Sequence, residues 1–180
     1  FAGMALSGAG ARPRIMGVCN VTPDSFSDGG DHAAPEQAIA FAKQLAGAGA
    51  DIIDIGGEST RPGALPVAEE NEIDRVLPVI ESLVGQGVPV SIDTRRARVM
   101  RAAIDAGAAL VNDVSGLSDD PDALAVVAAS NAPVVLMHMQ GQPENMQDDP
   151  SYMDVLSDVY DGLAARVDAC LNAGIALERI

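Results

Sequence analysis

Five short runs of apolar residues recur along the chain, and each has the length and composition of a buried β-strand. The runs are nearly continuous rather than alternating, and most are rich in Val and Ile. Such runs are typical of parallel strands that are covered on both faces. The predicted strands are 15–19, 52–55, 88–92, 109–111 and 134–137.

Apolar positions three or four residues apart lie between these runs and predict amphipathic helices. The predicted helices are 35–45, 69–84, 96–106 and 122–129. In the last of them, Asp120 is expected to cap the free amides while Pro121 occupies the first turn. A longer helix is predicted from Ser151 to about Ala173. Its apolar stripe suits a membrane or a partner helix as well, but the evenly charged opposite face favours packing in the core.

Strands that alternate with helices predict either a doubly wound sheet or a (β/α)₈ barrel. A doubly wound sheet binds its ligand at one crevice, whereas a barrel uses every strand end. Here polar groups follow five consecutive strands, at Asn20, 58–61, Asp93, Asn112 and His138. We therefore predict an α/β fold, the (β/α)₈ TIM barrel, of which residues 1–180 form a single domain with about the first five units, ending before strand six.

Composition and charge narrow the classes of partner. A hydrophobic content of 48% over 180 residues is enough for a core, and the net charge of −15 argues against nucleic acid. No apolar run approaches the ~20 residues of a membrane helix, and no secretion signal is recognisable. Cys19 and Cys170 are expected to be buried free thiols in a reducing cytoplasm. An anionic small molecule needs local help from arginines, helix N-termini or a metal ion.

The connection after the first predicted strand, residues 20–30, is longer than a structural turn requires. It exceeds the usual two to six residues by roughly a factor of two. It contains one amide, hydroxyl groups, carboxylates and one aromatic ring, including those of Asn20, Asp24 and Phe26. Long loops with hydrogen-bonding groups are more often functional than decorative. The segment predicts a small-molecule binding loop.

The next strand ends carry further candidates. After the second strand, Gly56 and Gly57 let backbone amides approach a ligand, and Arg61 offers a planar fork for phosphate or carboxylate. Asp93 and Asn112 could each cap a helix. Together on adjacent strands, however, they suit a flat heterocycle with amino and lactam edges. His138 could be an acid, a ligand or a core residue; the structural role is favoured because no second His or Cys has metal-site spacing.

These motifs, in this order, resemble dihydropteroate synthase along essentially the whole chain. The resemblance is carried by residues 20–30, 56–63, Asp93, 112–113 and 136–141. It implies an enzyme of folate biosynthesis with a (β/α)₈ barrel. Enzymes of that family join 7,8-dihydropterin-6-ylmethyl diphosphate to 4-aminobenzoate, release pyrophosphate and use Mg²⁺. The resemblance also implies that the protein forms a homodimer.

The resemblance also implies roles for individual residues. Asn20 would contact Mg²⁺ and the diphosphate, while Thr60 and Arg61 would bind the pterin diphosphate. Asp93 and Asn112 would hydrogen-bond the pterin ring. Phe26 and Pro62 would form part of the 4-aminobenzoate pocket, where sulfonamides also bind. Asp24, which helps order the closed loops, and Arg61 are the expected catalytic residues.

The family's later motifs, including a Ser-Arg-Lys segment and an Arg-x-His anion site, are not found in this sequence. Residues 1–180 alone are therefore expected to be poorly soluble and inactive. Two alternatives remain open: a pterin-binding methyltransferase that serves a corrinoid protein, or a non-catalytic remnant. The loops at 22–30 and 59–63 argue against the methyltransferase, because that activity needs neither an aminobenzoate pocket nor a diphosphate site.

Overall fold

A computed structural model describes residues 12–22, 33–59, 67–143 and 145–180 of the chain. Its strands are β1 (Met16–Asn20), β2 (Ile52–Gly56), β3 (Val90–Asp93), β4 (Leu110–Asp113) and β5 (Val134–Leu136). Its helices are α1 (Ala33–Gly47), α2 (Glu69–Val84), α3 (Ala97–Asp105), α4 (Ala123–Ala129) and α5 (Val155–Asn172), followed by the 3₁₀ helix η2 (Leu177–Arg179). The predicted strands and helices are confirmed, with shifts of a few residues at their ends.

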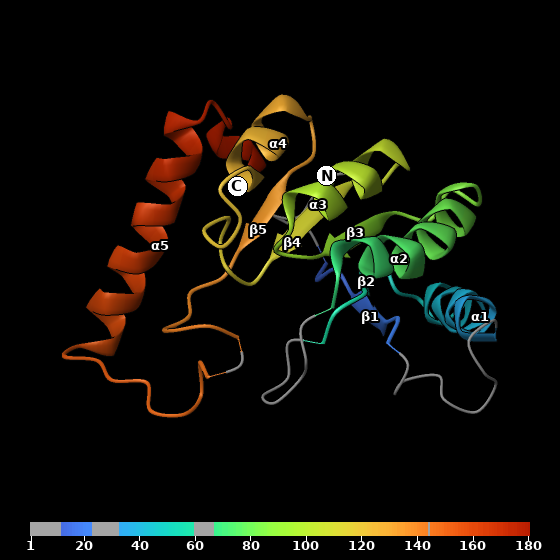
Figure 1. The fold of residues 1–180 in the computed structure, drawn as a ribbon, viewed down its shortest axis with the longest axis horizontal. Coiled ribbons are helices and arrows are strands. Elements are labelled where there is room, and N and C mark those ends of the chain that lie inside the picture. Colours follow the sequence, from blue (N-terminus) through green and yellow to red (C-terminus); the bar gives the residue numbers. More distant parts are fainter. Residues whose placement is uncertain (1–11, 23–32, 60–66, 144) are drawn as a thin grey trace.

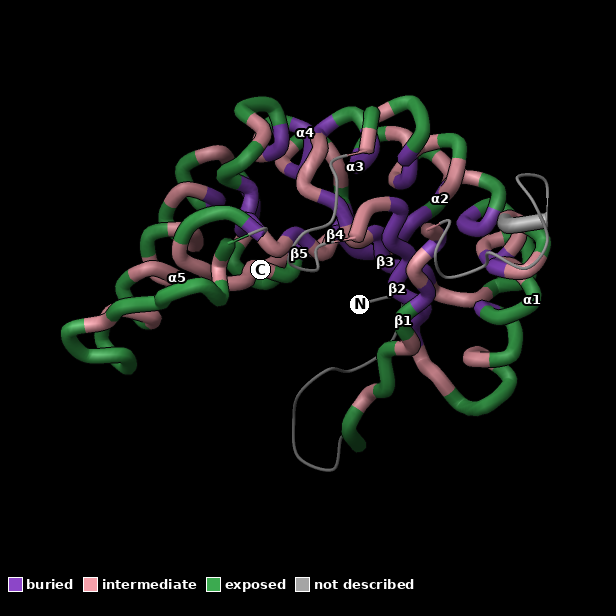
Figure 2. Tube along the Cα trace, turned by 60° about the horizontal axis from the view of Figure 1, so that its bottom comes forward, coloured by how far each residue is buried: buried purple, intermediate pink, exposed green. Residues whose placement is uncertain are grey.

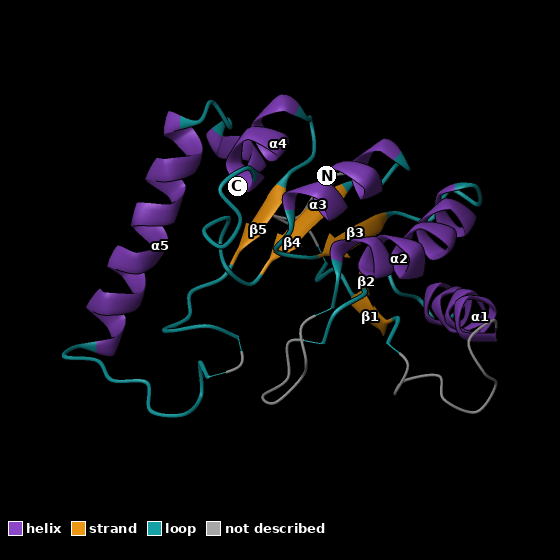
Figure 3. Cartoon of the chain, viewed as in Figure 1, coloured by secondary structure: helices purple, strands orange, loops and turns teal. Residues whose placement is uncertain are grey.

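The strands form one parallel sheet in the order β1-β2-β3-β4-β5, so every strand pairs with its neighbours in the sequence (Figures 1 and 3). Parallel neighbours need a crossover connection, and helices α1 to α4 provide it. In Figure 2 the sheet follows an arc, with these helices on its outer side. The carboxyl ends of all five strands consequently lie along one edge.

The core lies between the outer face of the sheet and helices α1 to α4. One register row on that face is almost completely buried and contains Cys19, Ile55, Ile92, Val111 and Val134. Side chains from the helices complete the cluster, among them Ala42, Val76, Ile80, Met100 and Val127. Apolar residues on the inner face are more open, and Val18 is 54% exposed.

Both cysteines are buried free thiols, as predicted. Burial raises the pKa of Cys19 to about 11, so this thiol is protonated and unreactive near neutral pH. Among the described residues, no helix has the length and apolar character that spanning a membrane requires.

Helix α5 does not pack as predicted along its whole apolar stripe. Leu156 is 80% exposed and Tyr160 is 71% exposed, whereas Cys170 in the last turn is fully buried. The reason is its position: α5 follows the outermost strand β5 and stands apart from the sheet over its first turns (Figure 1). Only the end of the helix reaches the core.

Asp120 accepts from an amide at the start of the predicted helix, as expected of a cap, but α4 itself begins two residues after Pro121. Helix α4 begins at Ala123, with Asp122 as its N-cap residue and no side-chain cap. One oxygen of Asp120 accepts from the amide of Asp122 at 2.9 Å, and the other accepts from the amide of Ala97 at 2.8 Å. Asp120 therefore ties the β4–α4 connection to the start of α3.

Candidate active site

Four strands bring one residue each to the same level at their carboxyl ends. The register pairs Asn20 with Gly56, Gly56 with Asp93, and Asp93 with Asn112. Each of these residues is the last or the next-to-last residue of its strand. The structure thus brings together the three predicted site residues that lie in its described part, and Asp93 and Asn112 are on adjacent strands, as predicted.

Gly56 leaves space between two of these side chains. A methyl group at this position would lie 3.2 Å from Oδ1 of Asn20 and 3.5 Å from Oδ2 of Asp93. The amide oxygen and the carboxylate therefore converge over the backbone of β2. Two acceptor oxygens beside an open backbone are suited to a cation or to a ligand with several N–H groups.

Asp54 belongs to the same site, although it was not among the residues predicted from the sequence. Its Oδ2 accepts a hydrogen bond from Nδ2 of Asn112 at 3.0 Å, and the residue is only 4% exposed. Its other oxygen has no hydrogen-bond partner among the described residues. The signal was available, because a carboxylate inside an otherwise apolar strand is rare unless it is paired.

Asp93 is in a strongly acidic environment. Burial first of all, and then the neighbouring carboxylates of Asp54, Asp113 and Glu72, together raise its pKa from 3.8 to about 7. Asp93 does not cap the following helix, since the amide of Ala97 at the start of α3 donates to Asp120. The carboxyl group of Asp93 is therefore available to a ligand that supplies N–H donors or positive charge.

Asp113, the neighbour of Asn112 at the end of β4, stabilises its own loop. Its two oxygens accept from the amide and hydroxyl of Ser115 and from the amide of Leu117, at 2.7 to 3.0 Å. Leu117 has a positive φ of 60°, which is rare for a branched side chain. The bond from Asp113 helps to hold this turn next to the site.

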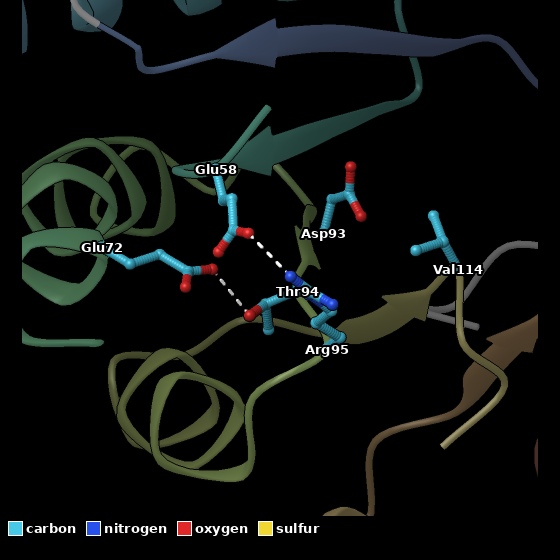
Figure 4. Close-up of a pocket in the computed structure, with 6 residues that line it drawn as sticks. All are labelled: Glu58, Glu72, Asp93, Thr94, Arg95 and Val114. Atoms are coloured by element: carbon cyan, nitrogen blue, oxygen red, sulfur yellow. Dashed lines mark hydrogen bonds and ion pairs between the residues drawn. The ribbon is translucent and has the colours of Figure 1, made fainter. Parts of the chain in front are cut away.

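A second set of charged residues surrounds the connection between β2 and α2. Glu58 accepts from Nη2 of Arg95 at 3.0 Å and from Nη2 of Arg96 at 2.6 Å. Glu72 accepts from the hydroxyl of Thr94 at 2.7 Å. Figure 4 shows Glu58, Glu72 and Arg95 around the small pocket next to Asp93. These contacts join residues that are distant in the sequence, so no local sequence pattern predicts them.

His138 has the surroundings of a structural residue. Its Nε2 lies 3.3 Å from the hydroxyl of Tyr152, and the two ring centroids are 5.9 Å apart. The ring also lies against the backbone of α5 at Gly162, where a methyl group would come within 2.5 Å of Nδ1. These contacts agree with the structural role favoured from the sequence.

Five predicted site residues lie outside the described residues: Asp24, Phe26, Thr60, Arg61 and Pro62. Their assigned roles stay predictions. In the part of the chain that the structure describes, no group of three or more His, Cys, Asp and Glu side chains could hold a metal ion.

Comparison with known proteins identifies the family. The family model described as "Pterin binding enzyme" matches residues 16–180. The chain belongs to the pterin-binding enzyme family. Among curated relatives of this family, the dihydropteroate synthase of Synechocystis is 45% identical over 179 residues, which is 99% of this chain and 62% of the relative.

Solved structures agree with this assignment. Dihydropteroate synthase from Xanthomonas albilineans, solved with 4-aminobenzoic acid, is 53% identical with a TM-score of 0.85, and the match covers 93% of this chain and 59% of that one. The Burkholderia cenocepacia synthase, complexed with 7,8-dihydropteroate, is 46% identical with a TM-score of 0.83, over 96% and 58% of the two chains. The chain thus spans about 60% of the length of these relatives.

The comparisons confirm two predictions. The five parallel strands and their helices match the first part of the (β/α)₈ barrel of dihydropteroate synthases, and the resemblance to that family is correct. The inner face of the sheet, where Asn20, Asp93 and Asn112 meet, is therefore the inner wall of the barrel at the end where barrel enzymes have their active sites.

Proposed function

We propose that the full-length gene product containing residues 1–180 is a dihydropteroate synthase. It would condense 7,8-dihydropterin-6-ylmethyl diphosphate with 4-aminobenzoate to give 7,8-dihydropteroate and pyrophosphate. The observation that carries the proposal is the register row of Asn20, Asp93 and Asn112 at the barrel mouth. Identity of 45% to 53% with the synthases of Synechocystis and Xanthomonas supports it.

The pterin ring would bind to Asp93 and Asn112. A pterin has an amino group and a ring N–H on one edge, and one carboxylate can accept from both. Such donors would favour the charged form of Asp93, whose pKa burial raises to about 7 in the free protein. The amide of Asn112, held by Asp54 at 3.0 Å, would supply the neighbouring contact.

The diphosphate would be bound by Asn20, Thr60 and Arg61, together with Mg²⁺. Mg²⁺ is usually held by one or two protein oxygens plus substrate phosphates and waters. The absence of a cluster of acids and histidines among the described residues is compatible with this pattern. The single amide oxygen of Asn20, beside the open backbone of Gly56, fits it too. When bound, the ion would neutralise charge on the departing diphosphate.

In the reaction, the amino group of 4-aminobenzoate forms a C–N bond to the pterin methylene while the C–O bond to diphosphate breaks. The arylamine then loses a proton. The role of the chain is to hold both reactants in line and to stabilise the developing charges, without a covalent enzyme intermediate. Phe26 and Pro62 would contact 4-aminobenzoate. Arg61 would stabilise the leaving group, and Asp24 would order the closed loops.

A direct assay tests the proposal. The full-length gene product is incubated with the pterin diphosphate, 4-aminobenzoate and Mg²⁺, and pyrophosphate release is measured. Asp93→Ala should weaken pterin binding by roughly 1–3 kcal/mol, because ligand donors lose their acceptor. A wild-type protein that releases no pyrophosphate would refute the synthase assignment.

Other predictions about the protein accompany this proposal. Residues 1–180 alone should show no turnover, and measurable turnover would contradict the argument from the missing motifs. The cytoplasmic location and the homodimer remain expectations. The corrinoid methyltransferase alternative gains no support, since the relatives described above are synthases.

A further inference from the structure

Arg96, at the start of α3, contacts both sides of the β2–α2 connection. Its Nη2 donates to the carboxylate of Glu58 at 2.6 Å, and its Nη1 donates to the backbone carbonyl of Val67. Glu58 precedes residues 60–66 and Val67 follows them. One guanidinium group therefore fixes the distance between the two ends of this connection and attaches both to α3.

The same guanidinium also faces α2. Its Nε lies 3.6 Å from Oε2 of Glu72, whose other oxygen accepts from Thr94 at 2.7 Å. Glu72 is 1% exposed, and the side chains of Arg96 and Glu58 are 16% and 10% exposed. An ion-pair network this well protected from water is held more rigidly than a surface pair. Only Arg has donors in a planar fork that can serve three acceptors at once.

The position of Arg96 links this connection to the pterin ring site. Asp93 is the last residue of β3, and Arg96 follows it by three residues. Arg95, between them, binds the other oxygen of Glu58 at 3.0 Å and Asp119 at 3.2 Å. Arg95 and Arg96 thereby cross-link the connections that follow β2, β3 and β4. Of the two arginines, Arg96 contacts both ends of the connection between β2 and α2.

We propose that Arg96 is a positioning residue for the diphosphate half of the substrate. It acts through Glu58 and Val67, the described residues on either side of 60–66, and holds these two residues in place relative to Asp93. This inference rests on the proposed function, in which that connection carries Thr60 and Arg61. It requires that loss of Arg96 impairs recognition of the diphosphate and leaves recognition of the pterin ring intact.

The test measures two ligands on the full-length gene product. One is the pterin diphosphate, and the other is the same pterin with a hydroxyl in place of the diphosphate. Arg96→Gln should weaken binding of the diphosphate and raise its KM by ~tenfold or more. Binding of the pterin alcohol should change by less than about twofold. Arg96→Lys, which keeps the charge but loses the fork, should give an intermediate effect.

Arg98→Gln is the matched control. Arg98 also joins α3 to the start of α2, where it binds Glu70 at 2.6 Å and Glu69 at 3.3 Å, but its side chain is 61% exposed. It touches neither Glu58 nor Val67, so both ligands should bind as in the wild type. If Arg96→Gln prevents folding, Glu58→Gln tests the same contact from the other side and should give the same selective loss.

Two results would overturn the inference. One is unchanged affinity for the pterin diphosphate in Arg96→Gln and Glu58→Gln. The other is an equal loss for the diphosphate and the alcohol, which indicates a general structural role. Failure of the proposed function is distinguishable, because a wild-type protein without synthase activity would release no pyrophosphate from any combination of substrates.

Discussion

The side-chain amide of Asn112 donates to the carboxylate of Asp54 at 3.0 Å, although β3 separates the strands that carry them. In the register, Asn112 pairs with Asp93, whereas Asp54 pairs with Ser91 two residues earlier. The bond therefore crosses the sheet diagonally, beneath the level of Asp93. It fixes the side-chain amide of Asn112 and places the carboxylate of Asp54 near Asp93, the other residue expected to bind the pterin ring.

Removal of Asp54 should weaken pterin binding without any direct contact being lost. Asp54→Ala deletes the acceptor that orients Asn112, and we expect a loss of ~1–2 kcal/mol in pterin affinity. Calorimetric titration of the full-length gene product with the pterin alcohol measures it. In a double-mutant cycle with Asn112→Ala, the second substitution should add little. Fully additive losses would show that Asp54 acts on the ligand independently of Asn112.

The raised pKa of Asp93 predicts a stability that falls as the pH rises. The carboxyl group ionises near pH 3.8 in the unfolded chain and near pH 7 in the folded protein. Between these pH values the folded state binds one more proton than the unfolded state. The contribution of Asp93 to the free energy of unfolding is therefore fully present below about pH 4 and is lost as the pH rises towards 7. Asp93→Asn cannot ionise. Its Tm should therefore decline less than that of the wild type between pH 4 and pH 8.

Asp51→Asn is the control of opposite sign for this prediction. Hydrogen bonds from Arg12 and from the amide of Ile15 lower the pKa of Asp51 to about 2. Its contribution is present above about pH 4 and is lost only as the pH falls towards 2. The Tm of Asp51→Asn should therefore change with pH in parallel with the Tm of the wild type from pH 5 to pH 8. A parallel curve for Asp93→Asn as well would contradict the titration assigned to Asp93.

Gly56→Ala should damage the site but not the fold. The added methyl group would lie 3.2 Å from Oδ1 of Asn20 and 3.5 Å from Oδ2 of Asp93. Alanine is also preferred over glycine within a strand by roughly 0.5–1 kcal/mol. We expect Tm to be unchanged or higher and affinity for the pterin diphosphate to be lower. Gly47→Ala, where the methyl group would meet nothing within 4 Å, should leave that affinity unchanged, with a Tm equal to or above that of the wild type because Gly47 lies in helix α1.

The sequence predicted the fold well because the strands are nearly continuous apolar runs, although the inner faces of β1 and β5 are partly exposed. Continuous apolar runs located all five strands, and helix α2 has the predicted bounds, Glu69–Val84. Asn20, Asp93 and Asn112 could be predicted as site residues since each ends or nearly ends an apolar run. Parallel topology then placed them at one edge.

What the sequence did not predict depends on contacts between distant segments. Asp54 lies inside an apolar run, and only the observed register shows that it faces Asn112. Arg96 and Glu58 are 38 residues apart, so no local pattern links them. The stripe of α5 has the periodicity of a core helix, but its burial depends on which elements lie beside it, and Leu156 remains 80% exposed.

Position 162 should tolerate only glycine, because the ring of His138 leaves no space for a side chain there. An alanine there would place its methyl group 2.5 Å from Nδ1 and 2.9 Å from Cε1 of that ring. Gly162→Ala should therefore destabilise the protein by about 1–3 kcal/mol, even though alanine favours a helix over glycine by roughly 1 kcal/mol. In a His138→Ala background the clash is gone, so the same substitution should become stabilising. Chemical unfolding of the four proteins measures this reversal of sign, and a destabilising effect in both backgrounds would show that the ring is not what Gly162 accommodates.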